Sequence, residues 1–213
     1  KYYAQQIDQS IIIQGQTTYN KKIDVKAETI GNITKIYFKR GDKVKKGQPL
    51  IEISKEDRFE LINSSKELIK LYEIEYSSTK QLIIKGLSSK SKLGLAAYNL
   101  ANAKSQLKNI KLDMDNTSIV SPFNGIITNK NVEITDYVTP GNILLTIVNL
   151  DPIKVQGYLS ELDINKVNIE TEATIENSNG DKKNGRIVFI SPLAEIATRT
   201  FEIEIEADNS DLT

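Results

Sequence analysis

The chain has 213 residues, and its 28 Lys and Arg are balanced by 28 Asp and Glu, so the formal net charge is zero. A balanced charge gives no electrostatic attraction for nucleic acid, and we expect no nucleic-acid partner. The absence of Cys and His excludes disulfides, Ser–His and Cys–His catalysis, and thiolate or imidazole metal sites. Carboxylate chemistry and Mg²⁺ or Ca²⁺ sites stay open, but the composition points away from an enzyme. We assign no catalytic, cofactor-binding or metal-binding residues.

An internal repeat relates residues 28–57 to residues 122–151, which align without a gap at an offset of 94 positions. Neither copy is large enough to bury a core alone. The repeat therefore predicts a small β-sandwich made of two half-motifs, residues 27–54 and 119–150. Four glycines share the offset, and we expect all of them to lie in turns: Gly31 with Gly125, and Gly47 with Gly141.

Residues 55–118 carry a different period. Apolar side chains there follow each other at steps of three and four, which is the heptad spacing of a coiled-coil seam. The seam positions are Leu93, Ala96, Leu100, Ala103, Leu107 and Ile110. Gly86 is a helix stop and the serines after it are N-cap residues, so the chain turns back there. The segment predicts an antiparallel coiled-coil α-hairpin whose arms of about 28 residues are about 40 Å long.

The last segment, residues 151–213, contains several short candidate strands. Residues 201–207 alternate between apolar side chains and Glu, so the carboxylates share one strand face. We interpret that face as solvated rather than as a cation site, because neighbouring carboxylates repel one another. The segment predicts an antiparallel β-barrel domain, which the N-terminal strand region, residues 1–26, joins. The expected fold is therefore mixed α and β, elongated and multi-domain.

The first half-motif, GDKVKKGQPLIEI at Gly41–Ile53, resembles that of a lipoyl or biotinyl carrier domain. In carriers the modified Lys stands at the tip of the turn after this strand, where this chain has Asp57, and Lys55 is out of register. The resemblance therefore implies the carrier fold without an attached cofactor. A hydrolase that uses only carboxylates is a further alternative. It needs two acids in one cleft with separated pKa values, and no clear pair is visible in the sequence.

A lipoyl motif divided by a helical hairpin and followed by a β-barrel resembles the periplasmic adaptor subunits, or membrane fusion proteins, of the HlyD and RND type. The resemblance implies the adaptor of a tripartite efflux pump for small molecules, with a homo-oligomer that is hexameric in the assembled pump. Its partners would be an inner-membrane transporter and a TolC-like outer-membrane channel. Further segments that resemble the family are residues 119–127, 150–155, 160–163 and 199–201.

The hairpin is short beside the very long coiled coils of type I secretion adaptors. We therefore expect an RND transporter rather than an ABC transporter, and we keep a type I secretion or ABC-exporter adaptor as the alternative. The resemblance also implies a periplasmic location with an N-terminal anchor in the inner membrane. We expect that anchor, and the C-terminal membrane-proximal part, to be absent from this chain.

In this family the hairpin tip docks onto the channel through an Arg, a Leu four residues later and a Ser seven residues beyond that. Leu82 and Ser89 match the pattern, while Ser78 stands at the Arg position. The resemblance implies a docking contact of Leu82 and Ser89 with the nearby cations Lys80 and Lys90. The residues themselves also allow a local role, because Leu82 can pack on the turn and Ser89 can cap the second helix.

Overall fold

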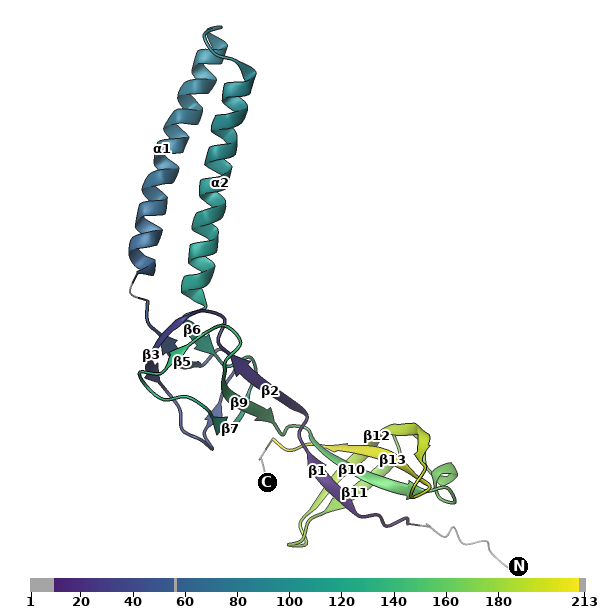
Figure 1. Cartoon of the computed structure of the whole chain (residues 1–213). Coiled ribbons are helices and arrows are strands. Elements are labelled where there is room, and N and C mark those ends of the chain that lie inside the picture. The colour runs from purple at the N-terminus through teal and green to yellow at the C-terminus, as the bar shows by residue number, and fades with distance from the viewer. Residues whose placement is uncertain (1–9, 56, 211–213) are drawn as a thin grey trace, which may run out of the picture. The chain divides into compact units, whose positions relative to one another are not determined.

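The computed structural model describes residues 10–55 and 57–210. The chain divides into two compact units: one is Asp24–Thr146, and the other contains the chain up to Ile23 and from Ile147 onward. Figure 1 shows two long helices and curled antiparallel sheets, so the fold is mixed α and β, as the sequence predicted. Residues 1–9, in the predicted N-terminal strand region, lie outside the described residues.

The two helices are α1 (Arg58–Ile84), of 27 residues, and α2 (Lys90–Asp115), of 26 residues. They lie side by side and are joined by a short turn (Figure 1). α1 ends before Gly86, whose φ of +72° is a left-handed conformation that other residues adopt at a cost. At 1.5 Å per residue each helix is about 40 Å long. The helices and their turn therefore form a rod of the predicted dimensions.

Both repeat copies contribute strands to each of two four-stranded sheets. In spatial order, one sheet consists of β2 (Lys21–Lys26), β9 (Ile143–Asn149), β7 (Gly125–Lys130) and β4 (Lys43–Val44). The other consists of β6 (Ser118–Val120), β5 (Pro49–Ile53), β3 (Gly31–Ile36) and β8 (Tyr137–Val138). β5 and β6 pair directly, although the two helices lie between them in the chain. The core side chains, each at most 1% exposed, include Ile33, Leu50, Ile51, Ile53, Ile127, Leu144 and Leu145.

The sequence repeat is also a repeat of turn geometry. The backbone N–H of Lys39 donates to the Asp42 carboxylate at 2.7 Å. In the second copy, the backbone N–H of Glu133 donates to the Asp136 carboxylate at 2.8 Å. Each carboxylate therefore closes its own turn, which explains why Asp recurs at the same place in both copies.

The four repeat glycines have two different roles. Gly47 and Gly141 lie in turns, with φ of +80° and +96°. Gly31 and Gly125 were predicted to lie in turns, but they begin the strands β3 and β7. At Gly31 the requirement is space as well as conformation, because a Cβ there would lie 2.7 Å from Cγ2 of Ile53.

The other unit contains a five-stranded antiparallel sheet. In spatial order its strands are β1 (Gly15–Thr18), β10 (Ile153–Ser160), β13 (Thr200–Ala207), β12 (Lys182–Glu195) and β11 (Glu172–Glu176). A short 3-10 helix, η1 (Ile164–Lys166), follows β10. Within residues 10–210, β1 and β11 leave the two edges of this sheet open, so it is a curled half-barrel rather than the predicted barrel. Its buried core consists of Val155, Leu159, Ile187, Ile203 and Ile205.

The two N-terminal strands, β1 and β2, belong to different sheets. β1 pairs with β10, with Gly15 opposite Gly157, and so lies in the half-barrel. β2, which the sequence analysis also placed with the barrel, lies beside β9 in a four-stranded sheet. A hydrogen bond from the Thr146 hydroxyl to the Asp24 carboxylate, 2.7 Å long, joins these two strands. This contact links positions 122 residues apart, so no local pattern predicted it.

The carboxylates of β13 are paired across strands, whereas the sequence analysis predicted a solvated face. Lys154 Nζ lies 3.1 Å from Glu204 and 3.5 Å from Glu206. The Gln156 amide donates to Glu202 at 2.6 Å. The Lys154 side chain is only 23% exposed, and its hydrogen bond to Glu204 raises the pKa of Lys154. A single lysine therefore forms ion pairs with two neighbouring carboxylates on a half-buried face.

Replacing Lys154 with methionine should lower the free energy of unfolding by about 1–2 kcal/mol, because two partly buried carboxylates lose their counter-charge. Urea denaturation at neutral pH, followed by tyrosine fluorescence, measures this change. Lys182→Met is the matched control, since Lys182 pairs with Glu176 where both side chains are more than half exposed. We expect that control to change stability by no more than about 0.5 kcal/mol. Equal losses in both variants would contradict the assigned role of Lys154.

Candidate functional site

The tip of the helix pair, residues 80–92, has a geometry set by backbone hydrogen bonds. The Leu87 N–H donates to the Leu82 carbonyl at 2.8 Å, which is the long bond of a Schellman motif. Ser89 is the N-cap of α2, and its hydroxyl accepts a 3.2 Å bond from the Lys92 N–H. The capping role that the sequence suggested for Ser89 is therefore present, whereas Leu82 takes part in the turn through its backbone carbonyl and its side chain is 43% exposed.

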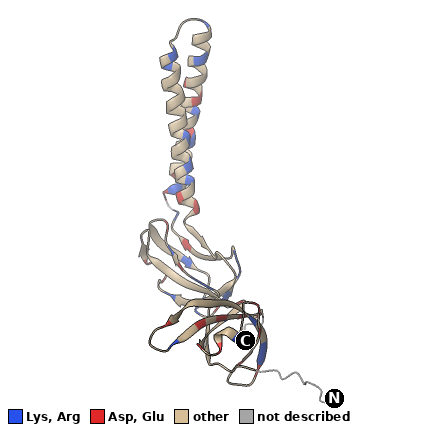
Figure 2. Cartoon of the chain, turned by 90° about the vertical axis from the view of Figure 1, so that its right-hand side faces the viewer, with Lys and Arg blue, Asp and Glu red and all other residues tan. Residues whose placement is uncertain are grey.

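The structure brings the four sequence-predicted docking residues together at this tip. Lys80, Leu82, Ser89 and Lys90 are all exposed there. Ser78, at the family's Arg position, is also exposed on α1. Figure 2 shows basic residues, in blue, on both helices close to the tip. Two apolar residues that the sequence analysis did not single out, Ile84 and Leu87, are 79% and 72% exposed.

Ser89→Ala should lower the stability of the helix pair by about 1 kcal/mol, because the Lys92 N–H loses its capping acceptor. Ser89→Asp keeps a capping oxygen and should stay within about 0.5 kcal/mol of the unaltered protein. Urea denaturation followed by the helical circular dichroism signal measures both variants. If alanine were as well tolerated as aspartate, Ser89 would not act as the cap.

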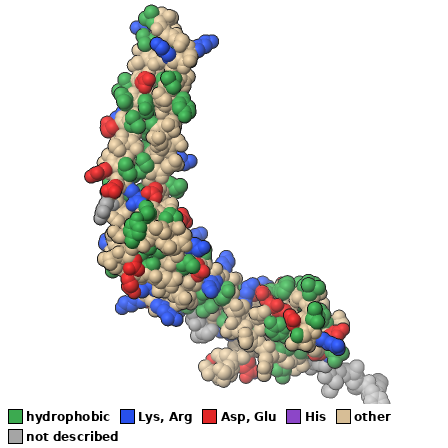
Figure 3. Space-filling model, in the orientation of Figure 1, with side chains coloured by type: hydrophobic (Ala, Val, Ile, Leu, Met, Phe, Trp, Pro, Cys, Tyr) green, Lys and Arg blue, Asp and Glu red, His purple; other side chains and the backbone are tan. Residues whose placement is uncertain are grey.

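All six predicted seam residues of α2 are buried or half-buried. Ala96 and Ala103 are 2% and 3% exposed, and their small side chains allow the two helices to approach closely. An ion pair of 2.9 Å between Lys104 and Glu73 also joins α2 to α1. Other apolar side chains lie outside the seam and are exposed on the surface of the rod (Figure 3): Leu61, Leu71, Ile74, Leu95, Tyr98 and Leu112.

A hydrogen-bonded cluster around Arg58 ties both helices to the strands at the base of the rod. Arg58 Nε donates to the Asp113 carboxylate of α2 at 2.6 Å. One Nη donates to the Ser54 carbonyl at 2.9 Å, and the other donates to the Thr29 hydroxyl at 2.7 Å and the Ile30 carbonyl at 2.9 Å. The Thr29 hydroxyl in turn donates to Asp113. The planar guanidinium thus connects α1, α2, the residue after β5 and the loop before β3.

The cluster also shifts the pKa of Asp113. Desolvation alone would raise that pKa, but hydrogen bonds from Thr29 and Arg58 and the positive charge of Arg58 outweigh it and hold the pKa below its ordinary value. The Arg58 side chain is only 12% exposed. Asp113 is therefore ionised at neutral pH and holds a largely buried cation in place.

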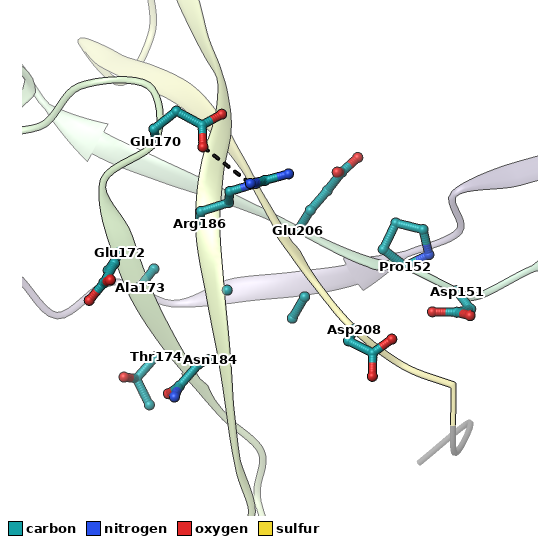
Figure 4. Close-up of a pocket in the computed structure, with 12 residues that line it drawn as sticks. Asp151, Pro152, Glu170, Glu172, Ala173, Thr174, Asn184, Arg186, Glu206 and Asp208 are labelled. Atoms are coloured by element: carbon teal, nitrogen blue, oxygen red, sulfur yellow. Dashed lines mark ion pairs between the residues drawn. The ribbon is translucent and has the colours of Figure 1, made fainter.

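The half-barrel carries an open hollow of about 870 Å³ between residues of β11, β12 and β13 and the turn before β10. Figure 4 shows five acidic side chains around it, Asp151, Glu170, Glu172, Glu206 and Asp208, and an ion pair of 3.3 Å between Glu170 and Arg186. Across the described part of the chain, no three acidic side chains converge closely enough to hold a metal ion. The hollow is therefore an acidic surface depression without the ligand geometry of a metal centre.

The described residues thus form a paired rod with an exposed tip and a stem tied to two sheets. The described helices also include none that is long and apolar enough to cross a membrane. Comparison with known proteins identifies the class. Residues 21–150 match the family described as RND MFP, barrel-sandwich hybrid domain, where MFP denotes a membrane fusion protein. The chain belongs to this family, whose members are adaptor proteins and not enzymes.

Individual relatives agree with the family. The cobalt-zinc-cadmium resistance protein CzcB of Cupriavidus metallidurans is 25% identical over 92% of this chain and 41% of its own length. The chain thus spans less than half of that relative. A membrane fusion protein from Streptococcus pneumoniae has a similar fold, with a TM-score of 0.71 and 19% identity over 93% of this chain and 90% of that one. A MacA–MexA chimera carrying the Pseudomonas aeruginosa MexA α-hairpin has a TM-score of 0.75 and 23% identity, over 92% and 71% of the two chains.

Sequence reasoning missed the Arg58 cluster and part of the tip. Arg58 and Asp113 are 55 positions apart, and no periodic pattern relates them. For the tip, a usable signal was present: no acidic residue occurs from position 76 to position 112. Charge counted segment by segment, rather than over the whole chain, would have directed attention to Lys85 and Lys92.

Proposed function

We propose that this chain is the rod-bearing part of a periplasmic adaptor in a tripartite efflux pump that exports small molecules. In this role it bridges an inner-membrane transporter of the RND type and a TolC-like outer-membrane channel. The observation that carries the proposal is the pair of 40 Å helices inserted between β5 and β6, with an exposed tip at its far end. A rod of this kind is suited to reaching a partner at a distance from the sheets.

In this proposal the two four-stranded sheets are a lipoyl-like sandwich, with half-motifs at residues 27–54 and 119–150. The coiled-coil α-hairpin occupies residues 55–118, and the domain that contains the half-barrel occupies residues 151–213. The Arg58 cluster supports this division, because it ties the stem of the hairpin to the sandwich at a single point. The hairpin can then be held in a defined direction relative to its sheets.

The proposed adaptor is a homo-oligomer, hexameric in the assembled pump. The apolar side chains outside the seam support association between copies, because a rod of two helices leaves them without a partner. Ile74, Leu95 and Tyr98 are 64%, 60% and 67% exposed. Their burial between neighbouring hairpins would remove apolar surface from water at about 25 cal/mol per Å².

Docking is assigned to the tip, through Leu82, Ser89, Lys80 and Lys90. The proposed location is the periplasm, with an N-terminal anchor in the inner membrane. An adaptor of a type I secretion system or an ABC exporter is the alternative, and the modest length of the helices favours the RND type. A lipoyl or biotinyl carrier is less favoured, because Asp57, at the position of the modified Lys, is the N-cap residue of α1 rather than the tip of a turn.

Affinity purification of the tagged full-length protein from its own cells, in mild detergent, tests this function. We expect an RND transporter and an outer-membrane channel to co-purify, both identified by mass spectrometry. Recovery of an ABC transporter with the channel would favour the alternative adaptor. Recovery of neither membrane partner, or of a carboxylase or dehydrogenase subunit with added mass on a Lys of this chain, would contradict the proposal.

A further inference from the structure

The tip of the rod carries charge of one sign. The chain as a whole is neutral, yet residues 76–112 contain seven Lys and no Asp or Glu. Four of these lysines lie at the tip, and all four are exposed: Lys80, Lys85, Lys90 and Lys92. The positive charge is therefore concentrated where the two helices meet.

The charge of these four lysines is not neutralised within the described chain. Lower on the rod, Lys104 pairs with Glu73 at 2.9 Å and Lys70 with Glu67 at 2.7 Å. Among the residues that the structure describes, no carboxylate lies within ion-pair distance of the tip lysines, and the sequence places none nearby. The positive charge of the tip is therefore available to attract a negatively charged partner.

Two of the lysines stand where a helix favours the opposite charge. Lys90 and Lys92 lie in the first turn of α2, which contains no acidic residue. The N-terminus of a helix carries a partial positive charge, so acidic residues stabilise it and lysines do not. Ser89 already caps this helix. Lys90 and Lys92 therefore oppose the stability of α2. Residues that break such a local rule are typical of functional positions.

We propose that the tip binds an acidic protein surface. Aspartate or glutamate side chains of the partner face the four lysines, and apolar groups of the partner contact Ile84 and Leu87. The inference rests on the proposed docking role of the tip and specifies the chemistry of the docking partner. The family pattern has a single Arg where this chain has Ser78, and here several lysines around the turn supply the positive charge instead. The docking contact therefore depends on the summed charge rather than on one bidentate hydrogen bond.

An acidic protein fits the tip better than an anionic membrane does. Helices that bind membrane surfaces lie flat and present a long apolar face. Here the lysines surround the end of the rod, and the two most exposed apolar residues among them are Ile84, at the end of α1, and Leu87, in the turn. Such a narrow end offers no long apolar face that could lie along a membrane surface.

The test uses the full-length tagged protein, immobilised and incubated with detergent-solubilised outer membranes of its own cells. The recovered outer-membrane channel is measured by quantitative mass spectrometry. Raising NaCl from about 0.05 M to about 0.5 M should reduce recovery about tenfold or more, because added salt screens exposed charges. Lys90→Glu with Lys92→Glu should cause a comparable loss at low salt, and Lys90→Gln with Lys92→Gln a smaller one.

Stability separates lost binding from lost folding. The charge-reversed variant should melt at the same temperature as the unaltered protein or higher, because acidic residues suit the first turn of α2. Lys108→Glu with Lys111→Glu is the matched control, since these exposed lysines lie on α2 away from the tip and the change in net charge is the same. We expect the control to retain at least about half of the channel recovery.

The outcomes separate this inference from the function on which it rests. Channel recovery that is insensitive to salt and to charge reversal would overturn the inference and leave the adaptor function intact. No channel recovery by the unaltered protein would contradict the adaptor function itself. Charge-dependent binding to phosphatidylglycerol vesicles, absent with phosphatidylcholine vesicles and without recovery of a channel, would assign the tip to a membrane and overturn the inference.

Discussion

Replacing Arg58 with alanine is expected to lower the free energy of unfolding by about 2–4 kcal/mol, because four acceptors, most of them partly buried, lose a shared donor. The guanidinium serves four acceptors at once, on α2, after β5 and in the loop before β3. Its loss leaves Thr29, only 2% exposed, without its cationic neighbour. Urea denaturation followed by the helical circular dichroism signal measures the change, and hydrogen exchange at the start of α1 should accelerate.

Two comparisons make the Arg58 prediction specific. Arg58→Lys keeps the charge but not the planar fork, and it should recover only part of the loss. Lys66→Ala removes an exposed cation from the same helix and should change stability by no more than about 0.5 kcal/mol. If Arg58→Ala behaved like Lys66→Ala, the cluster would not fix the base of the rod.

The Arg58 effect should also depend on pH. The folded pKa of Asp113 is lowered, so its stabilisation is present above the unfolded pKa of about 3.9 and is lost as the pH falls through the lower folded value. The stability difference between the unaltered protein and Arg58→Ala should therefore narrow below about pH 4. A difference that stayed constant through this range would show that Asp113 is not the principal partner.

Gly185→Ala is the second change with a large expected effect. Gly185 lies in β12 opposite Ala207 of β13, and a Cβ added there would lie 2.5 Å from the backbone oxygen of Glu206. Backbone cannot move aside as a flexible side chain does, so the two strands would have to separate locally. We expect a loss of about 2–4 kcal/mol in the stability of the half-barrel, measured by urea denaturation followed by tyrosine fluorescence.

The control for Gly185 is a glycine with free space around it. Gly180 lies in the turn between β11 and β12 with φ of +87°, and a Cβ there would meet no atom within 4 Å. Gly180→Ala should therefore cost only the conformational strain, about 1 kcal/mol. A loss for Gly185→Ala no larger than this would contradict the close approach of β12 and β13.

Periodic features of the fold could be predicted from the sequence. The heptad spacing predicted the buried positions Ala96 and Ala103, because a seam repeats every turn and identifies its own face. The ungapped repeat predicted two copies with equivalent turns, and Gly47 and Gly141 occupy such turns. These signals are local, so they do not depend on how distant segments meet.

Features that depend on long-range packing could not be predicted. β2 lies beside β9, where the Thr146 hydroxyl donates to the Asp24 carboxylate. The alternation of side chains along a strand does not indicate which of two sheets that strand will join. The alternation in β13 identified a face of carboxylates but not Lys154, which pairs with two of them from the neighbouring strand. The Arg58 cluster likewise joins segments far apart in the chain.

The central claim, that the tip meets an outer-membrane channel, is tested most directly by site-specific crosslinking in cells. The chain has no Cys, so Ser91→Cys in the full-length protein places a photo-crosslinker at one exposed position of the tip without touching the Ser89 cap. Ser105→Cys, exposed on the same helix below the tip, is the control. We predict capture of an outer-membrane channel from position 91 and not from position 105. Capture of no channel from position 91, with the protein folded and expressed, would contradict the account.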